Sequence, residues 1–551
     1  MLPESSGAQA RTHISLAGMI IGCIGCVIIT ASSVYTALKM GSLPWPTIFT
    51  SIMSLVLLRA CGRRSLNEVN VTQIIMSAGS MVAGGIAFTI PGIWMLGLAD
   101  TVSPLQIMGV ALAGTLLGLV CTALIRRRFV DESDLEYPIG TAAAETLLAS
   151  EAGGNTGRRL FVSMGLAGVY AAVRDVAHLL PPMIATLPIP GVAFAIYNSP
   201  MMLGVGFLIG ASAVGFQLAG GLLANFGLIW GGSTLGLVDL TTAQGMVASA
   251  GMGLMMGSGL GVVIKDILPK LAIQVRAHTK TQEGLVGDLT GRYDAGALAL
   301  MVALAVLIVV TILRLSPIVA VVVIAMSFVT TIMSAQSVGQ TGIDPMEIFG
   351  LIVLLLVAWI SDTASTGLFL VAALIAVTCG LAGDVMSDFK TGAVIGTDPR
   401  SMWYGQAIGA LLGSVIAVIT LCALFAAYGP EAFGPGKLFV SAQASVVATM
   451  VSGIPSVPFF VGGILGGILL HVLGLPAIMF GLGVYLPFFF TLTMFVGASA
   501  KFIYDRVMVS RGKARRESDE AGIVFASGLL GGESIVGVLI ALSSVIAGLL
   551  A

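Results

Sequence analysis

The sequence predicts an all-α, polytopic membrane protein built from two homologous helical units, and three observations support this prediction. Of its 551 residues, 57% are hydrophobic and only 10% are charged, whereas charged residues make up about a quarter of an ordinary soluble domain. Apolar stretches follow one another along the whole chain, and many reach the ~20 residues that a helix needs to cross a bilayer. Blocks of the first half also return in the second half in the same order.

The apolar stretches define the expected helices. They give about 14 to 16 crossings, because some are short enough to enter the membrane and leave on the same side. The first half contains the stretches 14–36, 43–60, 69–97, 103–125, 160–187, 200–226 and 240–266. After a polar loop at 269–292, the second half contains 293–314, 316–334, 346–361, 363–381, 403–428, 437–454, 456–473, 475–505 and 520–550.

Two sets of matches indicate that the second half repeats the first. At an offset of 300 residues, TAAAETLLA at 141–149 aligns with SAQASVVAT at 441–449. Further along, at an offset of 277 residues, the pattern MxGxG beginning at Met202 aligns with the same pattern beginning at Met479. We therefore expect one integral membrane domain made of two units, residues 1–285 and residues 286–551. Such internal repeats are typical of secondary transporters.

Basic residues predict which ends of the helices face the cytoplasm. They cluster at 59–64, 126–128, 158–159, 269–292 and 506–516. The positive-inside rule places these stretches, and the N-terminus with Arg11, on the cytoplasmic side of the plasma or inner membrane. The counterpart of 126–128 in the second unit, near residue 428, is almost uncharged, and this difference favours an inverted relation between the units.

The stretch at 138–150 is expected to be a short half-helix that does not cross the membrane. It combines a Pro-x-Gly start, a run of small residues and a Gly-Gly end, and it is too short to span. Its repeat partner is 438–452. A helix N-terminus offers free backbone N–H groups and partial positive charge, so both N-terminal ends are candidate sites for an anionic part of a substrate. The residues concerned are Gly140, Thr141, Ser441 and Gln443.

Ionisable residues inside apolar stretches are expensive to bury and are therefore candidates for function. Glu145 and Glu533 are the expected proton-coupling carboxylates, since a buried carboxylate can bind and release a proton near neutral pH. Asp384 and Lys390, in a broken segment at 382–400, are expected to contact substrate. Each of these groups could equally form a structural ion pair or mark a helix end. The weaker candidates are Arg174, Asp175, His178, Asp362, Asp388 and His471.

The glycines at four-residue spacing are expected to pack helices against one another, because small residues on one face allow close approach. They are Gly114/Gly118, Gly253/Gly257/Gly261 and Gly405/Gly409/Gly413.

Enzymatic function is not predicted. The chain contains no HExxH, no G-x-S-x-G and no phosphate-binding loop, and its polar loops are too short to hold a nucleotide-binding domain. No cofactor or resident metal is expected, because the CxxC at Cys23–Cys26 lies in an apolar helix and has no second pair at zinc spacing. A net charge of −1 gives no support for nucleic-acid binding.

Five stretches resemble the oligopeptide transporter (OPT) family, and they cover most of the chain in the family's order. They are NEVNVTQIIMSAGSMVAGGIAFTIPGIW (67–94), YPIGTAAAETLLASEAGG (137–154), DFKTGAVIGTDPRSMWYGQAIGALLG (388–413), GLPAIMFGLGVYLPFFFT (474–491) and GIVFASGLLGGESIVGV (522–538). The resemblance implies a secondary active transporter that carries small peptides or metal chelates inward with protons. The chain lacks the Asn-Pro-Gly motif of the eukaryotic peptide carriers, so it is more similar to prokaryotic members or to the yellow stripe-like metal-chelate branch.

Two other functions remain open from the sequence: a passive channel and a non-transporting membrane scaffold. A channel would need rings of like charge or a carbonyl filter, and neither is visible in the sequence. A scaffold would have no use for ionisable groups inside the membrane. The expected partners are therefore the substrate, protons and the lipid bilayer, and the sequence leaves open whether copies of the chain associate.

Overall fold

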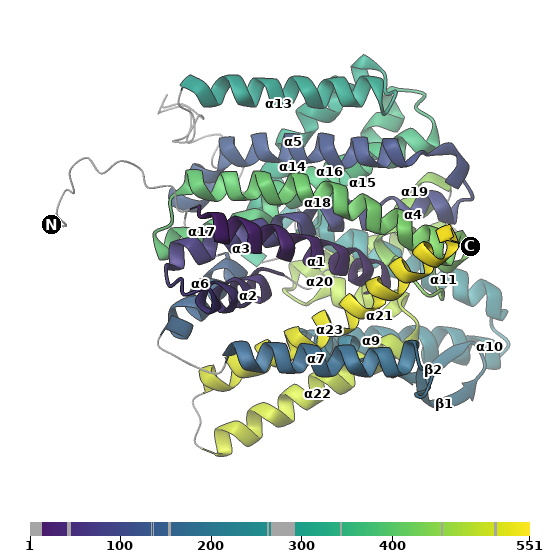
Figure 1. Ribbon diagram of the computed structural model, residues 1–551. Helices are drawn as coiled ribbons and strands as arrows, with labels where there is room; N and C mark the ends of the chain where they lie inside the picture. Colours follow the sequence, from purple (N-terminus) through teal and green to yellow (C-terminus); the bar gives the residue numbers. More distant parts are fainter. Residues whose placement is uncertain are drawn as a thin grey trace.

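The computed structural model describes residues 14–40, 46–133, 135, 137–151, 156–261, 264–265, 292–341, 344–452, 456–511 and 515–550. Nearly all of these residues are helical, and the predicted all-α, polytopic class is confirmed. In Figure 1 most long helices run side by side across the molecule.

The helices of the first half follow the expected order. They are α1 (Leu16–Met40), α2 (Pro46–Ala60), α3 (Leu66–Ala87), α4 (Pro91–Met95), α5 (Pro104–Arg126), α6 (Pro138–Glu151), α7 (Thr156–Asp175), α8 (Pro200–Ile209), α9 (Ala211–Leu222), α10 (Gly232–Thr234) and α11 (Leu240–Gly261). Short 3₁₀ and π-helical pieces accompany them at η1 (Ala99–Thr101), η2 (Arg127–Asp131) and η3 (Leu223–Gly231).

The second half contains a similar series. Its elements are α13 (Arg292–Thr311), α14 (Pro317–Thr341), α15 (Met346–Ile360), α16 (Ser365–Cys379), η6 (Gly380–Asp384), α17 (Val385–Ile395), α18 (Pro399–Tyr428), η7 (Pro430–Ala432), α19 (Ala442–Ser452), α20 (Val457–Val472), α21 (Ala477–Tyr485), α22 (Phe488–Ser510) and α23 (Arg515–Leu550).

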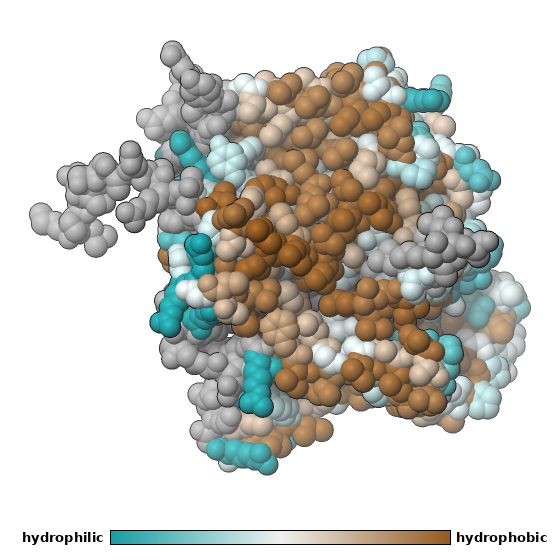
Figure 2. All heavy atoms as spheres, viewed as in Figure 1, coloured by the Kyte–Doolittle hydropathy of each residue, from teal (hydrophilic) through white to brown (hydrophobic). Residues whose placement is uncertain are grey.

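Seven of the described helical stretches are long and apolar enough to cross a membrane. They are Leu16–Lys39, Leu66–Met95, Pro104–Asp131, Ala211–Thr234, Pro317–Gly339, Ser365–Ile395 and Pro399–Tyr428. Shorter apolar helices accompany them, so the full number of crossings stays a prediction. On the face shown in Figure 2, apolar residues gather across the middle, between hydrophilic residues at the left and right ends. This distribution on the visible face matches a surface that contacts the hydrocarbon core of a bilayer.

The apolar stretch at 160–187 was expected to be one helix, but the helix ends early. α7 stops at Asp175, and the chain then forms an antiparallel hairpin of β1 (Met183–Ile189) and β2 (Val192–Tyr197). Two features explain the difference. Pro181 and Pro182 lack the N–H that would continue a helix, and Gly191, with φ of 74°, closes the hairpin turn.

Two other expected single helices are each divided in two. The stretch at 200–226 breaks at Gly210, where φ is 86°, and the stretch at 475–505 breaks before Pro487. The resulting pairs, α8–α9 and α21–α22, occupy matching places in the two halves.

The order of elements repeats along the chain at the offsets expected from the sequence. α1 and α14 both contain 25 residues, and α2 and α15 both contain 15. The short helices α6 and α19 then precede α7 and α20, and the series closes with α11 and α23. The predicted boundary between residues 285 and 286 lies outside the described residues, so the limits of the two units stay a prediction.

Corresponding helices of the two halves run antiparallel where they touch. Between α5 and α18, Thr115 bonds to Ser414 at 2.8 Å, and Gln406 donates to Thr122 at 3.2 Å, so one helix descends as the other rises. α3 and α16 meet in the same sense, since Gly85 faces Val377 and Gly380 faces Met81. An inverted relation, which the basic residues favoured, agrees with this geometry.

The glycine faces pack helices of one half against helices of the other, as expected. A Cβ on Gly413 of α18 would lie 2.1 Å from Cα of Gly79 on α3. In the same way, a Cβ on Gly257 of α11 would lie 2.1 Å from the carbonyl oxygen of Ile464 on α20. No side chain fits at these crossings, so the close approach of the two halves depends on glycine.

We therefore expect Gly413→Leu to destabilise the protein, because the new side chain has to displace the backbone of α3. Overpacking of this kind costs about 1–3 kcal/mol. Gly462→Leu is the matched control, since Gly462 lies on α20 with no atom within 4 Å of its Cβ position. Thermal unfolding of the purified proteins should show a lower midpoint for the first variant and an unchanged midpoint for the second. Equal midpoints would show that the α3–α18 crossing tolerates a side chain.

Candidate functional site

The N-terminal end of α6 is packed against α17. Gly140 is buried, and a Cβ there would lie 2.1 Å from the carbonyl oxygen of Ser387. Thr391 Oγ1 donates a hydrogen bond of 2.8 Å to the carbonyl oxygen of Gly140. Thr141 is half-buried, and its N–H already donates to the carbonyl oxygen of Tyr137 at 2.9 Å. This end of the helix therefore contacts the broken segment that the sequence also singled out.

The N-terminal end of α19 is built in the same way. Ser441 precedes the helix with φ of 44°, as Tyr137 precedes α6 with φ of 46°. The N–H of Ser441 donates to the carbonyl oxygen of Leu38 at the end of α1, and the N–H of Tyr137 donates to that of Gly339 at the end of α14. Gln443 is buried. The hydroxyl of Ser441 is buried without a hydrogen-bond partner.

The two N-terminal ends do not face each other. Figure 1 shows α6 at the left end of the molecule, beside α17, and α19 at the right end, beside α4. A single anion clamp made from both ends, as the sequence suggested, is therefore not formed. Each end belongs to a separate group of polar residues.

Asp384 and Lys390 lie on the elements next to α6. Asp384 closes the π-helical turn η6, is 3% exposed, and its Oδ1 has no hydrogen-bond partner. Lys390 Nζ donates to the carbonyl oxygen of Leu135 at 3.0 Å, just before α6 begins. Lys390 therefore binds a backbone carbonyl oxygen, whereas Asp384 is a buried acid that forms no ion pair with the described residues.

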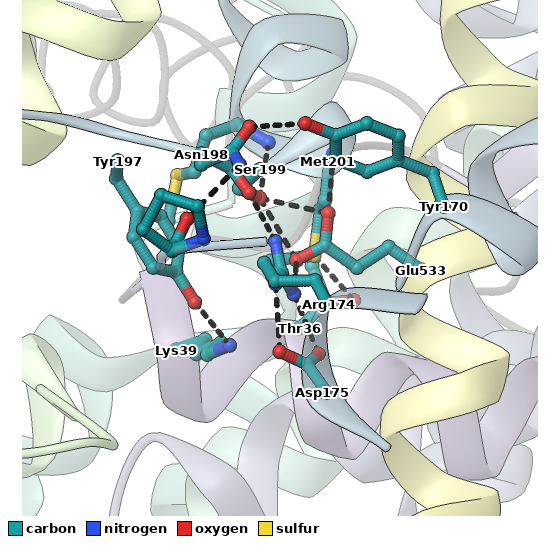
Figure 3. Close-up of polar contacts among 12 residues, drawn as sticks. Thr36, Lys39, Tyr170, Arg174, Asp175, Tyr197, Asn198, Ser199, Met201 and Glu533 are labelled. Carbon is teal, nitrogen blue, oxygen red and sulfur yellow. Dashed lines mark hydrogen bonds and ion pairs between the residues drawn. The ribbon is translucent and has the colours of Figure 1, made fainter. Parts of the chain in front are cut away.

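Glu533 lies at the centre of a buried ionic group, which Figure 3 shows. Its carboxylate accepts a hydrogen bond of 2.8 Å from Arg174 Nη2, and both side chains are 1% exposed. Ser199 Oγ lies 2.8 and 2.9 Å from the two carboxylate oxygens, and the N–H of Met201 donates at 2.9 Å. Elements from both halves, α7, α8 and α23, thus converge on one carboxylate.

Arg174 and Asp175 form a bidentate pair, although neighbouring helix residues point about 100° apart and need not pair. The guanidinium donates to both oxygens of Asp175, at 2.7 and 2.6 Å, while it also binds Glu533. It donates as well to the carbonyl oxygen of Asn198, just after the hairpin. One arginine therefore ties α7 to α23 and to the end of β2.

Lys39, at the end of α1, is a buried cation that sequence analysis missed. It is 3% exposed, and its Nζ donates to the hydroxyl of Tyr197 at 2.7 Å. The rings of Tyr35 and Tyr197 flank the ammonium, with centroids 5.1 and 5.2 Å away. Within the described residues it forms no ion pair with a carboxylate. In the sequence, Lys39 lies just beyond the first apolar stretch, a position where a lysine is common at the end of a helix.

The other candidates are dispersed. Glu145 lies in α6, but its side chain is outside the described part of the structure. Asp362 and His178 are exposed in loops, and His471 lies near the end of α20, so these three are not buried inside helices. Asp388 is fully buried on α17, where Gln73 and Ser77 donate to it at 2.7 and 2.6 Å.

Two successive series of helices, a surface rich in apolar residues and buried ionic groups are typical of a polytopic membrane protein of the secondary-transporter class. Comparison with known families makes this more specific. The model of the OPT oligopeptide transporter protein family matches residues 13–283 and 290–544. The chain therefore belongs to the OPT family of transporters, as its sequence motifs indicated.

Individual relatives agree with this assignment. The chain is 24% identical to a protein of Haemophilus influenzae that is named as a proposed oligopeptide transporter, and the match covers 92% of each chain. It is 31% identical to a rice protein, YSL6, named as a proposed metal-nicotianamine transporter, over 30% of this chain and 26% of that protein. A second rice protein of that kind, YSL10, is 29% identical over 31% of this chain and 28% of its own length.

The ion pair between Arg174 and Glu533 leads to a stability prediction. Glu533→Leu leaves the guanidinium buried with one partner fewer, and removing one member of a buried pair costs about 3–5 kcal/mol. The double variant Arg174→Leu/Glu533→Leu should recover part of this loss, because neither charge is then left buried alone. Thermal unfolding of both variants measures the difference.

A partly exposed pair provides the control. Lys501 and Asp505 are 20% and 23% exposed and pair at 3.1 Å. Asp505→Leu should cost less than about 1 kcal/mol, as expected for pairs in contact with solvent. If the double variant is less stable than Glu533→Leu, the two charges do not compensate each other.

Proposed function

We propose that this protein is a proton-coupled secondary active transporter that imports small oligopeptides or peptide-like metal chelates across the cell membrane. The observation that carries this proposal is the family match, which covers both halves of the chain. The buried ionic groups add physical support, since ionisable side chains at membrane depth are costly and usually serve transport.

The choice of substrate class rests on the named relatives and on charge. Peptides and metal–nicotianamine chelates both carry carboxylates. Lys39 supplies a buried positive charge, and the neighbouring α19 end supplies a helix N-terminus and the unpartnered hydroxyl of Ser441. Together these groups suit a substrate carboxylate better than a cation.

The inferred orientation places the N-terminus in the cytoplasm. α1 and α3 run parallel, since Gly18 faces Thr72 and Gly25 faces Met76, and α3 runs parallel to α18. The starts of these three helices therefore lie on one side, with Arg400, and so does the end of α5, with Arg126 to Arg128. The positive-inside rule assigns this side to the cytoplasm.

Glu533 would take part in coupling only through its ion pair. Its carboxylate accepts hydrogen bonds from Arg174 and two further donors, so this ion pair joins α7 to α23. In this proposal the ion pair between Arg174 and Glu533 stabilises one conformation of the transporter, and it breaks when the conformation changes. Glu145 stays a candidate for direct proton binding.

Uptake into proteoliposomes tests the proposed function. With a proton gradient, acidic outside, the protein should accumulate a carboxylate-bearing di- to hexapeptide or an iron or nickel chelate above the external concentration. Dissipating the gradient with a protonophore should reduce uptake to equilibration. Equilibration under both conditions would indicate a passive channel, and no entry of any tested solute would contradict transport.

The two predicted N-terminal sites can be tested by binding. Thr141→Leu and Gln443→Leu each remove polar atoms beside a helix end and should weaken substrate binding, while folding stays near normal. Thr391→Val is a useful comparison for the first, because it removes the hydrogen bond to Gly140 without changing Thr141. Ligand-induced thermal stabilisation measures the change. Parental binding in both leucine variants would place the substrate elsewhere.

A further inference from the structure

Most of the buried side-chain atoms that lack a hydrogen-bond partner gather in one region. Among the described residues, nine of the sixteen such atoms belong to α2, α3, η6, α17 and the residues before α15. They lie on Thr47, Ser51, Asn70, Gln73, Asp344, Asp384 and Ser387. Buried polar atoms in proteins almost always have hydrogen-bond partners, so a concentration of unpartnered atoms in one region requires an explanation.

Two carboxylates are the most unusual members of this group. Oδ1 of Asp384 has no hydrogen-bond partner, and neither oxygen of Asp344 makes a hydrogen bond of normal geometry, although the Ser334 hydroxyl lies beside Asp344; the two acids are 3% and 7% exposed. They lie near each other, because Gly383, which precedes Asp384, faces Oδ2 of Asp344 at 3.1 Å from its Cβ position. An ionised carboxylate that is buried without donors is strongly disfavoured, and two neighbouring ones are more so.

Asp388 lies one turn beyond Asp384, and its carboxylate, unlike Oδ1 of Asp384, accepts hydrogen bonds. Gln73 and Ser77 donate to its two oxygens, which supports the ionised form. Oε1 of Gln73 is left without a partner, although Gln73 is fully buried. It is an unused acceptor next to the acids, where a protonated carboxyl group could donate.

No basic side chain among the described residues neutralises the two acids. Lys390 donates to the carbonyl oxygen of Leu135, and Arg126 pairs with Asp131 at 2.8 Å and lies over the ring of Phe389. Other titratable groups on the surrounding elements are Cys121 on α5, Tyr137 before α6, Glu347 on α15 and Cys379 on α16, all neutral or acidic. Helices α2 and α3 also carry Arg59, in the last turn of α2, and Glu68, in the first turn of α3. The charged groups that act on Asp384 are the acids Asp344, Asp388 and Glu347.

A bound metal does not account for the region. Among the residues that the structure describes, no group of three or more histidine, cysteine or acidic side chains could hold a metal ion. A proton needs only one carboxylate oxygen, whereas a divalent ion needs about six oxygen ligands.

We propose that Asp344 and Asp384 form the proton-binding site of the transport cycle, with Asp388 as their ionised neighbour. This inference rests on the proposed proton-coupled function and assigns it to residues other than Glu533. A proton binds to one of the two carboxylates by forming an O–H bond. The same bond breaks when the proton is released later in the cycle. No other bond is made or broken.

Position supports this assignment. Gln73 and Ser77 lie about two to three turns from the start of α3, so the acids are inside the half of the molecule that carries the basic ends. Lys39 and Glu533 belong to the group around the end of α1 and the hairpin, toward the other face. The proposed proton site and the Lys39 group would thus lie toward opposite ends of the molecule.

Infrared spectroscopy tests the site without a transport assay. Difference spectra between acidic and alkaline pH record the carbonyl stretch of protonated carboxylic acids. The parent protein should show a band that titrates, and the double variant Asp344→Asn/Asp384→Asn should lose the part of this band that the two buried acids contribute. Asp362→Asn is the matched control, since Asp362 is an exposed acid in a loop, and this variant should keep the band.

Transport then tests the role. In Asp384→Asn, gradient-driven accumulation should fall to equilibration while counterflow exchange persists, because asparagine resembles the protonated acid. Asp344→Asn is the second variant if Asp384→Asn does not fold. A band of unchanged intensity in the double variant, or full accumulation in a folded single variant, would overturn the assignment. If the parent itself shows no proton-driven uptake, the proposed function fails, and the infrared result still decides whether the acids bind a proton.

Discussion

A charge inside a membrane protein needs a partner, and this constraint orders the interior of the molecule. Glu533 satisfies it completely, with Arg174, Ser199 and the N–H of Met201 around its carboxylate. Lys39 satisfies it in part, through a tyrosine hydroxyl and two aromatic rings. Asp344 and Asp384 do not satisfy it, and the proposed proton site is built on these two residues.

The two halves pack in the same way but place different charged groups beside equivalent helices. Glycine crossings join α3 to α18 and α11 to α20, and matching turns precede α6 and α19. The start of α6 packs against Ser387, next to Asp388, and lies near Lys390, whereas the start of α19 contacts the end of α1, which carries Lys39. Equivalent turns at the two ends of the molecule thus lie beside different charged groups.

The sequence predicted the fold well, because composition, glycine spacing and the repeated blocks are physical constraints on helices in a bilayer. The hairpin at 183–197 was missed, because its apolar composition resembles a helix and only the prolines indicate otherwise. The site was predicted less well. Sequence singled out Glu533 and Asp384 as buried charges, but only the structure shows that the first has an arginine partner and the second has none. Lys39 and Asp344 lie at helix ends in the sequence, and their burial depends on contacts with distant segments.

The most direct test of this account is the pH dependence of substrate affinity in the parent protein and in Asp384→Asn. If protons and substrate are coupled, each changes the affinity of the other, so the affinity of the parent should vary with pH. In Asp384→Asn one of the two proton-binding acids is replaced by a neutral side chain, so the affinity should vary much less with pH than in the parent. The same pH dependence in both proteins would contradict the account.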